Sequence, residues 1–323
     1  MDEEPTVASP ACEKIKPGKA AQYDAAAKAL ISTPEFMHAI ISTLVPDAKG
    51  MTLEDFKRSC RMQKSDHLGL AMLPTENAVE GEGKISYDVL CSLLDEEGIV
   101  MSFIDIEAQK KPSTGYSLPV RGMYYRARML SSQFQSEGDE HMTETYRNLK
   151  KVYSIWLCFN CPAKYAGRII EYKTEPRAVF GEVNAERDYM DLGSLIMVYL
   201  PKVYKVTDNA DDSKEASLID LLSAVFNESL DLETKRAKMK ERGIAMSEKV
   251  EGGVIEMCNL GEGIAEQAAE QARAETRESD SKEFAKMLFT KYHESIEEVA
   301  KAFPDLSLET LKRLKAECDK EFK

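Results

Sequence analysis

Two acidic residues on neighbouring predicted strands are the first candidates for chemistry. Asp88 lies in a β-rich run over 84–94, Glu107 lies near the end of a second run over 99–109, and a short turn ending in glycine separates the two. This pattern predicts a β-hairpin in which a carboxylate from each strand can converge. Carboxylates are hard oxygen ligands and, with a main-chain carbonyl near Ala108 and water molecules, would suit octahedral Mg²⁺ or Mn²⁺. Such an ion can acidify an attacking water and offset the charge that develops as a phosphodiester breaks.

The surroundings of these acids leave two interpretations open. Acidic residues of strands usually lie on a solvated face, which would give Asp88 and Glu107 no chemical role. However, Asp88, Asp105 and Glu107 stand among apolar residues of both runs, and a buried acid needs a partner or an ion to offset its desolvation. Because side chains alternate along a strand, Glu107 and Gln109 share one face.

Arginine and tyrosine residues gather on the helix that is predicted after the hairpin, over 120–134. They are Arg121, Tyr124, Tyr125, Arg126 and Arg128. Guanidinium groups can bind phosphates bidentately, and tyrosines can stack or donate hydrogen bonds. We assign substrate binding to Arg121, Tyr125 and Arg126, with Arg121 as the preferred phosphate contact. Helix packing and surface solubility are the alternative for the whole group.

The charge of the chain is acidic but unevenly distributed. The formal net charge of −13 argues against a protein that coats nucleic acid by bulk attraction, because phosphate binding needs a positive local surface. Between 110 and 175, however, eleven basic residues accompany six acidic ones. An ordinary solvated surface of mixed charge accounts for this local excess, so the excess alone does not indicate a DNA partner.

The pattern of apolar residues predicts an α/β core followed by helices. Residues 1–20 have no apolar periodicity and predict a disordered leader, whereas 21–205 predict a core in which helices flank a mixed central sheet. Besides the hairpin, strands are expected over 152–159, 168–172 and 194–200. Residues 206–323 predict a helical extension, which could pack on the core, mediate self-association or contact DNA.

Three predicted helix starts carry the pattern of a capping box. They are Thr52 with Asp55, Ser217 with Asp220, and Ser295 with Glu298. In each pair, the hydroxyl and the carboxylate can satisfy free main-chain amides at the beginning of a helix.

Several other classes of protein are disfavoured. No run approaches the roughly eighteen apolar residues of a membrane helix, and the first residues lack the blocks of a signal peptide, so a cytoplasmic protein without membrane contact is expected. The seven cysteines indicate reduced thiols, and the pair Cys158 and Cys161 lacks the further ligands of a zinc site. The sequence also lacks the signatures of hydrolases that use a serine or cysteine nucleophile.

A long part of the sequence resembles a known group of nucleases. The segments that carry the likeness are GKISYDVLCSLLDEEG (83–98), FIDIEAQKKPSTGYSLPVRGMYYRARMLSSQF (103–134) and LKKVYSIWLCFNCP (149–162). They are similar to the PD-(D/E)XK family of transposase-type nucleases from bacteria and their mobile elements, which also resembles the recombination-promoting nucleases. With YDAAAKALIS upstream and KERGIAMSEKV and EMCNLGEGI downstream, the similarity covers roughly 21–265.

The resemblance implies a restriction-endonuclease-like core and metal-dependent cutting of DNA in mobile-element movement, recombination or defence. It assigns the metal, Mg²⁺ or Mn²⁺, to Asp88 and Glu107, and it gives Gln109 the place of the family's final Lys or Gln, where an amide can orient water or phosphate. Lys110 could supply the positive charge that an amide lacks, although its alternate strand direction favours a solvated lysine. Asp47 stands where relatives often have an acid and could be a further metal ligand, but an exposed carboxylate at a helix end is the favoured interpretation. A catalytically weak relative that binds nucleic acid or a protein partner is the alternative.

Overall fold

The structure, a computed structural model, consists of two compact units, Met1–Gly261 and Glu262–Lys323. The residues that it describes are 18–62, 76–79, 83–110, 115–134, 146, 148–183, 191–204 and 213–321. The predicted leader lies outside these residues except at its end, where α1 begins at Lys19.

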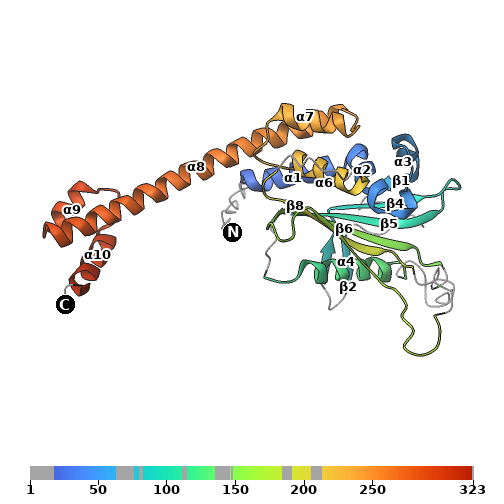
Figure 1. Ribbon diagram of the computed structural model, residues 1–323, viewed down its shortest axis with the longest axis horizontal. Coiled ribbons are helices and arrows are strands. Elements are labelled where there is room, and N and C mark those ends of the chain that lie inside the picture. The colour runs from blue at the N-terminus through green and yellow to red at the C-terminus, as the bar shows by residue number, and fades with distance from the viewer. Residues whose placement is uncertain are drawn as a thin grey trace, which may run out of the picture. The chain divides into compact units, whose positions relative to one another are not determined.

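A six-stranded sheet forms the centre of the first unit (Figure 1). In order across the sheet, its strands are β1 (Cys60–Met62), β4 (Val89–Leu94), β5 (Val100–Gln109), β6 (Lys151–Cys161), β8 (Ser194–Pro201) and β7 (Arg168–Lys173). The pairs β1–β4, β4–β5 and β7–β8 are antiparallel, and β5–β6 and β6–β8 are parallel. The predicted mixed sheet is therefore confirmed, as are the three strands expected after the hairpin.

The first strand of the predicted hairpin is interrupted at Asp88. β3 (Gly83–Ser86) pairs with β2 (Glu76–Val79) in a separate two-stranded sheet, whereas β4 begins at Val89 and pairs with β5. The prediction that Asp88 lies inside a strand is wrong, because its main-chain N–H donates to the Glu107 carboxylate instead of to a neighbouring strand. The hairpin of β4 and β5 itself is confirmed.

Helices cover both faces of the sheet. On one face lie α1 (Lys19–Ile31), α2 (Pro34–Leu44) and α6 (Lys214–Val225), and on the other lies α4 (Leu118–Ser132) (Figure 1). The other described helices are η1 (Pro46–Ala48), α3 (Leu53–Ser59), α7 (Leu232–Glu241), α8 (Glu248–Lys291), α9 (Ile296–Ala302) and α10 (Leu308–Glu321). Because α6 packs on α2 and β8, it belongs with the sheet, in the unit that ends at Gly261.

Two of the three predicted capping boxes are confirmed. They are Thr52 with Asp55 at α3 and Ser295 with Glu298 at α9. The third is wrong, because α6 begins one turn earlier, where the Ser213 hydroxyl accepts a hydrogen bond from the main-chain N–H of Ala216. Ser217 lies inside α6, and its hydroxyl instead accepts from Arg242.

An apolar core fills the space between the sheet and α4. Its buried members include Phe103, Tyr125, Met129, Val152, Trp156 and Leu195. Because alternate residues of a strand share a face, Asp105 and Glu107 lie on the same face of β5 as Phe103. The two acids therefore project towards this core and α4.

The two cysteines of the C-x-x-C pattern are part of the same core. Both thiols are free and buried, and Cys161 Sγ donates to the carbonyl oxygen of Cys158 at 3.2 Å. Burial raises the pKa of Cys161 to about 11, so this thiol stays protonated. Within the described part of the chain, no helix is long and apolar enough to cross a membrane.

The second unit has a small apolar core of its own. Its buried members are Ala285, Phe289, Val299, Leu306, Leu311, Leu314 and Cys318. They come from the end of α8, from α9, from the turn that follows it and from α10, so these helices pack on one another.

Lys235 on α7 is a buried cation. Its side chain is 1% exposed and its Nζ has no hydrogen-bond partner among the described residues. Burial lowers its pKa more than the nearby Cys258, Glu228 and Asp231 raise it. Because a charge without a partner is costly inside a protein, Lys235→Met should raise the free energy of unfolding by about 1–3 kcal/mol. Urea unfolding at neutral pH measures this difference.

Lys238 on the same helix provides the control. Its Nζ lies 3.3 Å from Asp220 Oδ2 and 3.1 Å from Glu241 Oε2. Lys238→Met removes these ion pairs and should lower stability. A loss of stability in Lys235→Met as well would mean that the buried ammonium group is satisfied, against this prediction.

Candidate active site

Asp88 and Glu107 meet where β4 begins and β5 ends. Glu107 Oε1 accepts a hydrogen bond from the main-chain N–H of Asp88 at 3.0 Å, and Asp88 Oδ2 accepts one from the main-chain N–H of Ala108 at 3.0 Å. These two bonds fix both carboxylates relative to the main chain. Glu107 is 6% exposed and the Asp88 side chain is 19% exposed, so solvent reaches the pair mainly at Asp88. The structure thus brings together the two acids that the sequence singles out.

Lys28 of α1 reaches the same carboxylate. Its Nζ lies 2.8 Å from Asp88 Oδ1 and 3.4 Å from Asp24 Oδ2. Burial alone would lower the pKa of Lys28, but the two carboxylates outweigh burial and raise it. The charged ammonium group therefore neutralises Asp88. The sequence analysis missed Lys28, because no local pattern relates a lysine on the first helix to the end of a distant strand.

Asp105 lies deeper than Glu107, two residues earlier on the same face of β5. It is fully buried, its Oδ2 accepts from the Ser154 hydroxyl at 2.9 Å, and Trp156 Nε1 donates to that hydroxyl at 2.9 Å. Burial and the charge of Glu107 raise the pKa of Asp105 well above its usual range. Asp105 Oδ1 has no hydrogen-bond partner among the described residues. In the sequence, the spacing Asp105-x-Glu107 within an apolar strand indicates that Asp105 lies on the same face as Glu107.

Glu107 is poised to exchange a proton near neutral pH. Burial, followed by the charge of Asp88, raises the pKa of Glu107 from 4.5 to about 7, although the hydrogen bond from the Asp88 N–H opposes the rise. Perturbed carboxyl groups of this kind gather at functional sites, because chemistry at neutral pH needs groups that titrate there. The cluster of three acids is therefore the strongest candidate site in the described part of the chain.

Arg121 of α4 reaches the same cluster between aromatic side chains. Its Nη1 donates to the Tyr116 hydroxyl at 3.0 Å, and its Nη2 donates to the Tyr125 hydroxyl at 2.7 Å. The guanidinium carbon lies 5.1 Å from the ring centre of Tyr125 and 5.3 Å from that of Trp156. Its charge favours the ionised form of Glu107. Of the residues that we assigned to substrate binding, Arg121 and Tyr125 thus lie at the acids.

Gly122 allows α4 to approach the sheet at this point. A Cβ atom at Gly122 would lie 2.5 Å from Leu195 Cδ1 and 3.2 Å from Trp156 Nε1, which is closer than packed atoms allow. The absence of a side chain therefore sets the distance between α4 and the sheet. It places the neighbouring Arg121 near Glu107.

Arg126 and Arg128 have other partners. Arg126 is 7% exposed, and its Nη2 donates to the carbonyl oxygens of Leu192 at 3.1 Å and Gly193 at 2.8 Å. Arg128 is 3% exposed, and its Nη1 donates to the Tyr124 hydroxyl at 3.1 Å. Residues five apart on a helix point in different directions, so Arg126 anchors α4 to the start of β8 while Arg121 faces the acids. The structure does not bring Arg126 to the site.

Gln109 and Lys110 end the strand that carries the acids. Gln109 is half-buried and lies on the same face of β5 as Glu107. Lys110 Nζ lies 2.8 Å from Glu228 Oε1, so its charge is engaged elsewhere. The positive charge beside Asp88 comes from Lys28 instead.

Asp47 is remote from the acid cluster. Its Oδ1 lies 3.7 Å from Nζ of Lys151, the first residue of β6. In the parallel β5–β6 pair, Lys151 aligns with Ser102, near the beginning of β5, whereas Glu107 lies near its end. Asp47 is therefore at the opposite end of these strands and does not extend the site.

The acid cluster contains oxygen atoms of the kind that bind divalent cations. Asp88, Asp105 and Glu107 outnumber the cations that act on them, Lys28 and Arg121, and Asp105 Oδ1 has no donor among the described residues. The carboxylates of Asp88, which is partly exposed, and of Glu107, which is buried, are ligands of the type that Mg²⁺ and Mn²⁺ prefer. No group of three or more His, Cys, Asp or Glu within the described ranges could hold a metal ion, so an ion here would depend on water and substrate ligands.

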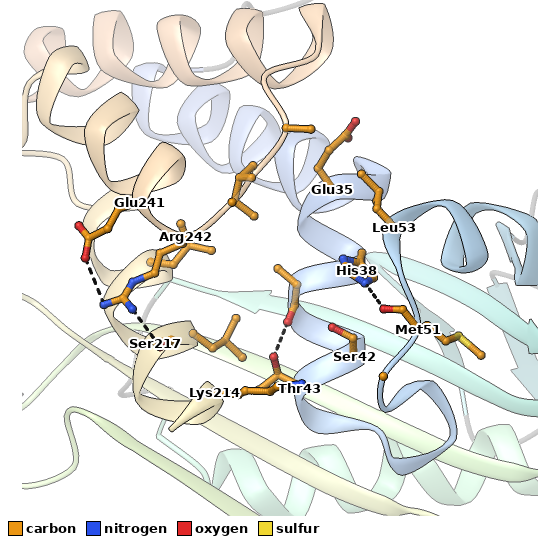
Figure 2. A pocket seen from close by; sticks show the side chains of 17 residues that line it. Glu35, His38, Ser42, Thr43, Met51, Leu53, Lys214, Ser217, Glu241 and Arg242 are labelled. Carbon is orange, nitrogen blue, oxygen red and sulfur yellow. Dashed lines mark hydrogen bonds and ion pairs between the residues drawn. The ribbon is translucent and has the colours of Figure 1, made fainter. Parts of the chain in front are cut away.

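A cavity of about 620 Å³ lies away from the acids, on the face of the sheet that α2 and α6 cover. Figure 2 shows the Arg242 guanidinium bound to Glu241 and Ser217, and the His38 ring bound to the Met51 carbonyl. These polar side chains of the cavity wall therefore already have partners within the protein. The cavity shares no lining residue with the acid cluster.

The acid cluster combines three carboxyl groups with two cations. Its central features are the paired carboxylates, the buried third acid and the two flanking cations. Comparison of the chain with family models, with curated proteins and with solved structures gives no match.

Proposed function

We propose that the protein is a metal-dependent nuclease of the PD-(D/E)XK type that hydrolyses phosphodiester bonds of DNA. The observation that carries the proposal is the pairing of Asp88 and Glu107 beside Asp105, whose Oδ1 has no donor among the described residues. Three acids gathered at a strand end are costly unless protons or a cation offset their charge. The mixed sheet between helices suits the restriction-endonuclease-like core that this assignment requires.

In this proposal Asp88 and Glu107 hold Mg²⁺ or Mn²⁺, which would acidify the attacking water and offset charge on the phosphate. Glu107 must be ionised to act as a ligand, and its pKa of about 7 lets it lose its proton near neutral pH. Asp105 Oδ2 accepts a hydrogen bond from the Ser154 hydroxyl, and this pair forms the floor of the site. Arg121, which the Tyr116 and Tyr125 hydroxyls orient, binds a phosphate oxygen.

Lys28 could supply the positive charge that Gln109 lacks at the site. An amide has no full charge, but the Lys28 ammonium group lies 2.8 Å from Asp88 Oδ1 and carries one. An ammonium group has three donors, so it can bind a carboxylate and a water or phosphate oxygen together. We therefore assign the electrostatic role of the family's lysine to Lys28, and the orientation of water or phosphate to Gln109.

A protein that binds without cutting is the second candidate. Two observations favour it: Lys28 already occupies Asp88 Oδ1, and Glu107 is only 6% exposed. Both would hinder the entry of a metal ion. Such a protein would bind nucleic acid through the surroundings of Arg121, or a protein partner, including a second copy, through α9 and α10.

A cutting assay with the full chain separates the two candidates. Plasmid and linear DNA, with RNA in parallel, should be cut in Mg²⁺ or Mn²⁺ and left intact in EDTA. Asp88→Asn removes a ligand charge, and because a metal contributes several kcal/mol to the rate, cutting should fall by about a hundredfold or more.

Asp24→Asn is the matched control, because Asp24 also binds Lys28 but is not paired with Glu107. It should cut at nearly the rate of the unaltered protein. Equal cutting by Asp88→Asn would refute the site. Binding of DNA without cutting in either metal would select the second candidate.

A further inference from the structure

Exposed apolar side chains form a stripe along the outer side of α4. The stripe consists of Tyr116, Val120, Met123, Tyr124 and Ala127, and the first four are 54%, 68%, 42% and 42% exposed. Val120, Met123, Tyr124 and Ala127 follow the spacing i, i+3, i+4, i+7, so they lie on one side of the helix. Contiguous apolar groups at a surface indicate a binding face. We call these five residues the α4 stripe.

Positive charge lies beside both exposed rings of the α4 stripe. The Arg121 guanidinium donates to the Tyr116 hydroxyl, and the Arg128 guanidinium donates to the Tyr124 hydroxyl and lies 5.8 Å from the centre of that ring. Arg121 is half-buried and Arg128 is buried beside its ring, and α4 has no acidic residue in a chain whose net charge is −13. A complementary partner must therefore combine negative charge with flat apolar groups.

Unpaired nucleotides have this combination. Their phosphates are anionic, and their bases expose π-faces that stack on aromatic side chains without regard to sequence. In a duplex the bases stack on one another, so only phosphates and groove edges would meet the α4 stripe. The chemistry of the stripe therefore favours a single strand over a duplex.

A chain of contacts links Tyr116, at one end of the α4 stripe, to the acid cluster. The Tyr116 hydroxyl accepts a hydrogen bond from Arg121, whose guanidinium carbon lies 5.3 Å from the ring centre of Trp156. Trp156 Nε1 donates to the hydroxyl of Ser154, which donates to Asp105. From Val120 to Ala127 the helix rises about 10 Å, which is room for about three stacked bases at roughly 3.4 Å each. A strand that lies on the stripe would thus lead to the carboxylates.

We propose that the α4 stripe is a stacking platform for unpaired bases and that the protein acts on single-stranded DNA or on a single-stranded segment of DNA. The inference rests on the proposed function, because it names the form of DNA that is presented to Asp88 and Glu107. Tyr124 supplies the central stacking surface, and Val120 and Met123 flank it.

Binding in EDTA tests the platform independently of cutting. The full chain is titrated calorimetrically with a thymidine oligonucleotide of about twelve nucleotides and with a duplex of equal length, at one salt concentration. The single strand should bind about tenfold more tightly. Tyr124→Leu keeps an apolar side chain but loses the flat ring, so it should weaken single-strand binding about tenfold and leave duplex binding unchanged. Tyr124→Phe keeps the ring and should bind like the unaltered protein.

A matched pair of aliphatic substitutions supplies the control. Val120→Ser removes an exposed apolar group from the α4 stripe and should weaken single-strand binding. Ile99→Ser removes one that is 51% exposed in the β4–β5 turn, at the far end of β5 from Glu107, and should have no effect. Thermal unfolding of each variant shows whether its fold is intact.

Equal affinity for single strand and duplex, or no effect of Tyr124→Leu, would overturn the inference. So would a change in oligomeric mass upon Val120→Ser without a change in DNA affinity, which would identify the α4 stripe as a protein interface. Failure of the nuclease proposal is distinct: the protein would not cut in Mg²⁺ or Mn²⁺, yet Tyr124-dependent single-strand binding would persist and support the platform.

Discussion

Replacing Glu107 with glutamine is expected to stabilise the protein at alkaline pH and, in the same variant, to remove cutting of DNA. Glutamine retains an oxygen for the main-chain N–H of Asp88, and its amide can donate to the Asp105 carboxylate, which now lacks a donor at Oδ1. The buried charge disappears. A metal ion loses a ligand charge at the same time, so the rate of cutting should fall by about a thousandfold or more.

The gain in stability should depend on pH in a defined direction. Because the pKa of Glu107 rises from 4.5 to about 7 on folding, the folded protein binds this proton more tightly than the unfolded chain does. The resulting stabilisation is complete below 4.5 and is lost as the pH rises through about 7. Glutamine cannot ionise, so the variant avoids this loss, which is worth on the order of 3 kcal/mol above neutral pH.

Urea unfolding in mildly acidic and in alkaline buffer measures the effect. The difference between Glu107→Gln and the unaltered protein should be large in alkaline buffer and small in acidic buffer. Glu171→Gln, which changes an exposed carboxylate on β7, should show little difference in either. A gain of equal size at both pH values would show that burial of the Glu107 charge is not its cause.

Gly193→Ala is expected to be the most destabilising single substitution that we propose. Gly193 has a φ of +80°, and a Cβ atom there would lie 2.2 Å from the carbonyl oxygen of Val152 and 2.8 Å from its nitrogen. Both contacts involve the main chain of the central strand β6, which cannot move aside without breaking its ladder. Strain and overlap together should cost about 4 kcal/mol or more. Thermal unfolding should show a midpoint lower by about 10 °C or more.

Gly98 provides a control that isolates the effect of overlap. Its φ is +82°, close to that of Gly193, but a Cβ atom there would meet nothing within 4 Å. Gly98→Ala should therefore cost only the strain of the left-handed conformation, about 1 kcal/mol. If both alanine variants lose the same stability, the close approach of Gly193 to Val152 is not the cause.

The parts of the fold that follow local patterns could be predicted from the sequence. Two apolar runs around a turn that ends in Gly98 predict the β4–β5 hairpin. The spacing of hydroxyl and carboxylate residues predicts the capping boxes of α3 and α9. The pattern at Ser217 gave a wrong helix start, because the hydroxyl of Ser213, one turn earlier, caps α6 instead. Local patterns do not decide between two such caps.

The site was harder to predict because tertiary contacts build it. Asp88 lies in a sequence that predicts one continuous strand. Its main-chain N–H, however, donates to the carboxylate of Glu107, and the strand is interrupted there. Lys28 reaches Asp88 from another element altogether. Arg126 shares the sequence neighbourhood of Arg121 but points to the carbonyl oxygens at the start of β8. Sequence spacing finds candidate residues, whereas packing selects among them.

Trp156 is the only tryptophan of the chain, and it lies in the floor of the acid cluster. Its indole N–H donates to Ser154, the partner of Asp105, and its ring faces the guanidinium group of Arg121. Since indole emission responds to nearby charge, the protein carries an intrinsic optical probe. The wavelength and intensity of its fluorescence would therefore change if a charged ligand bound there, without any attached dye.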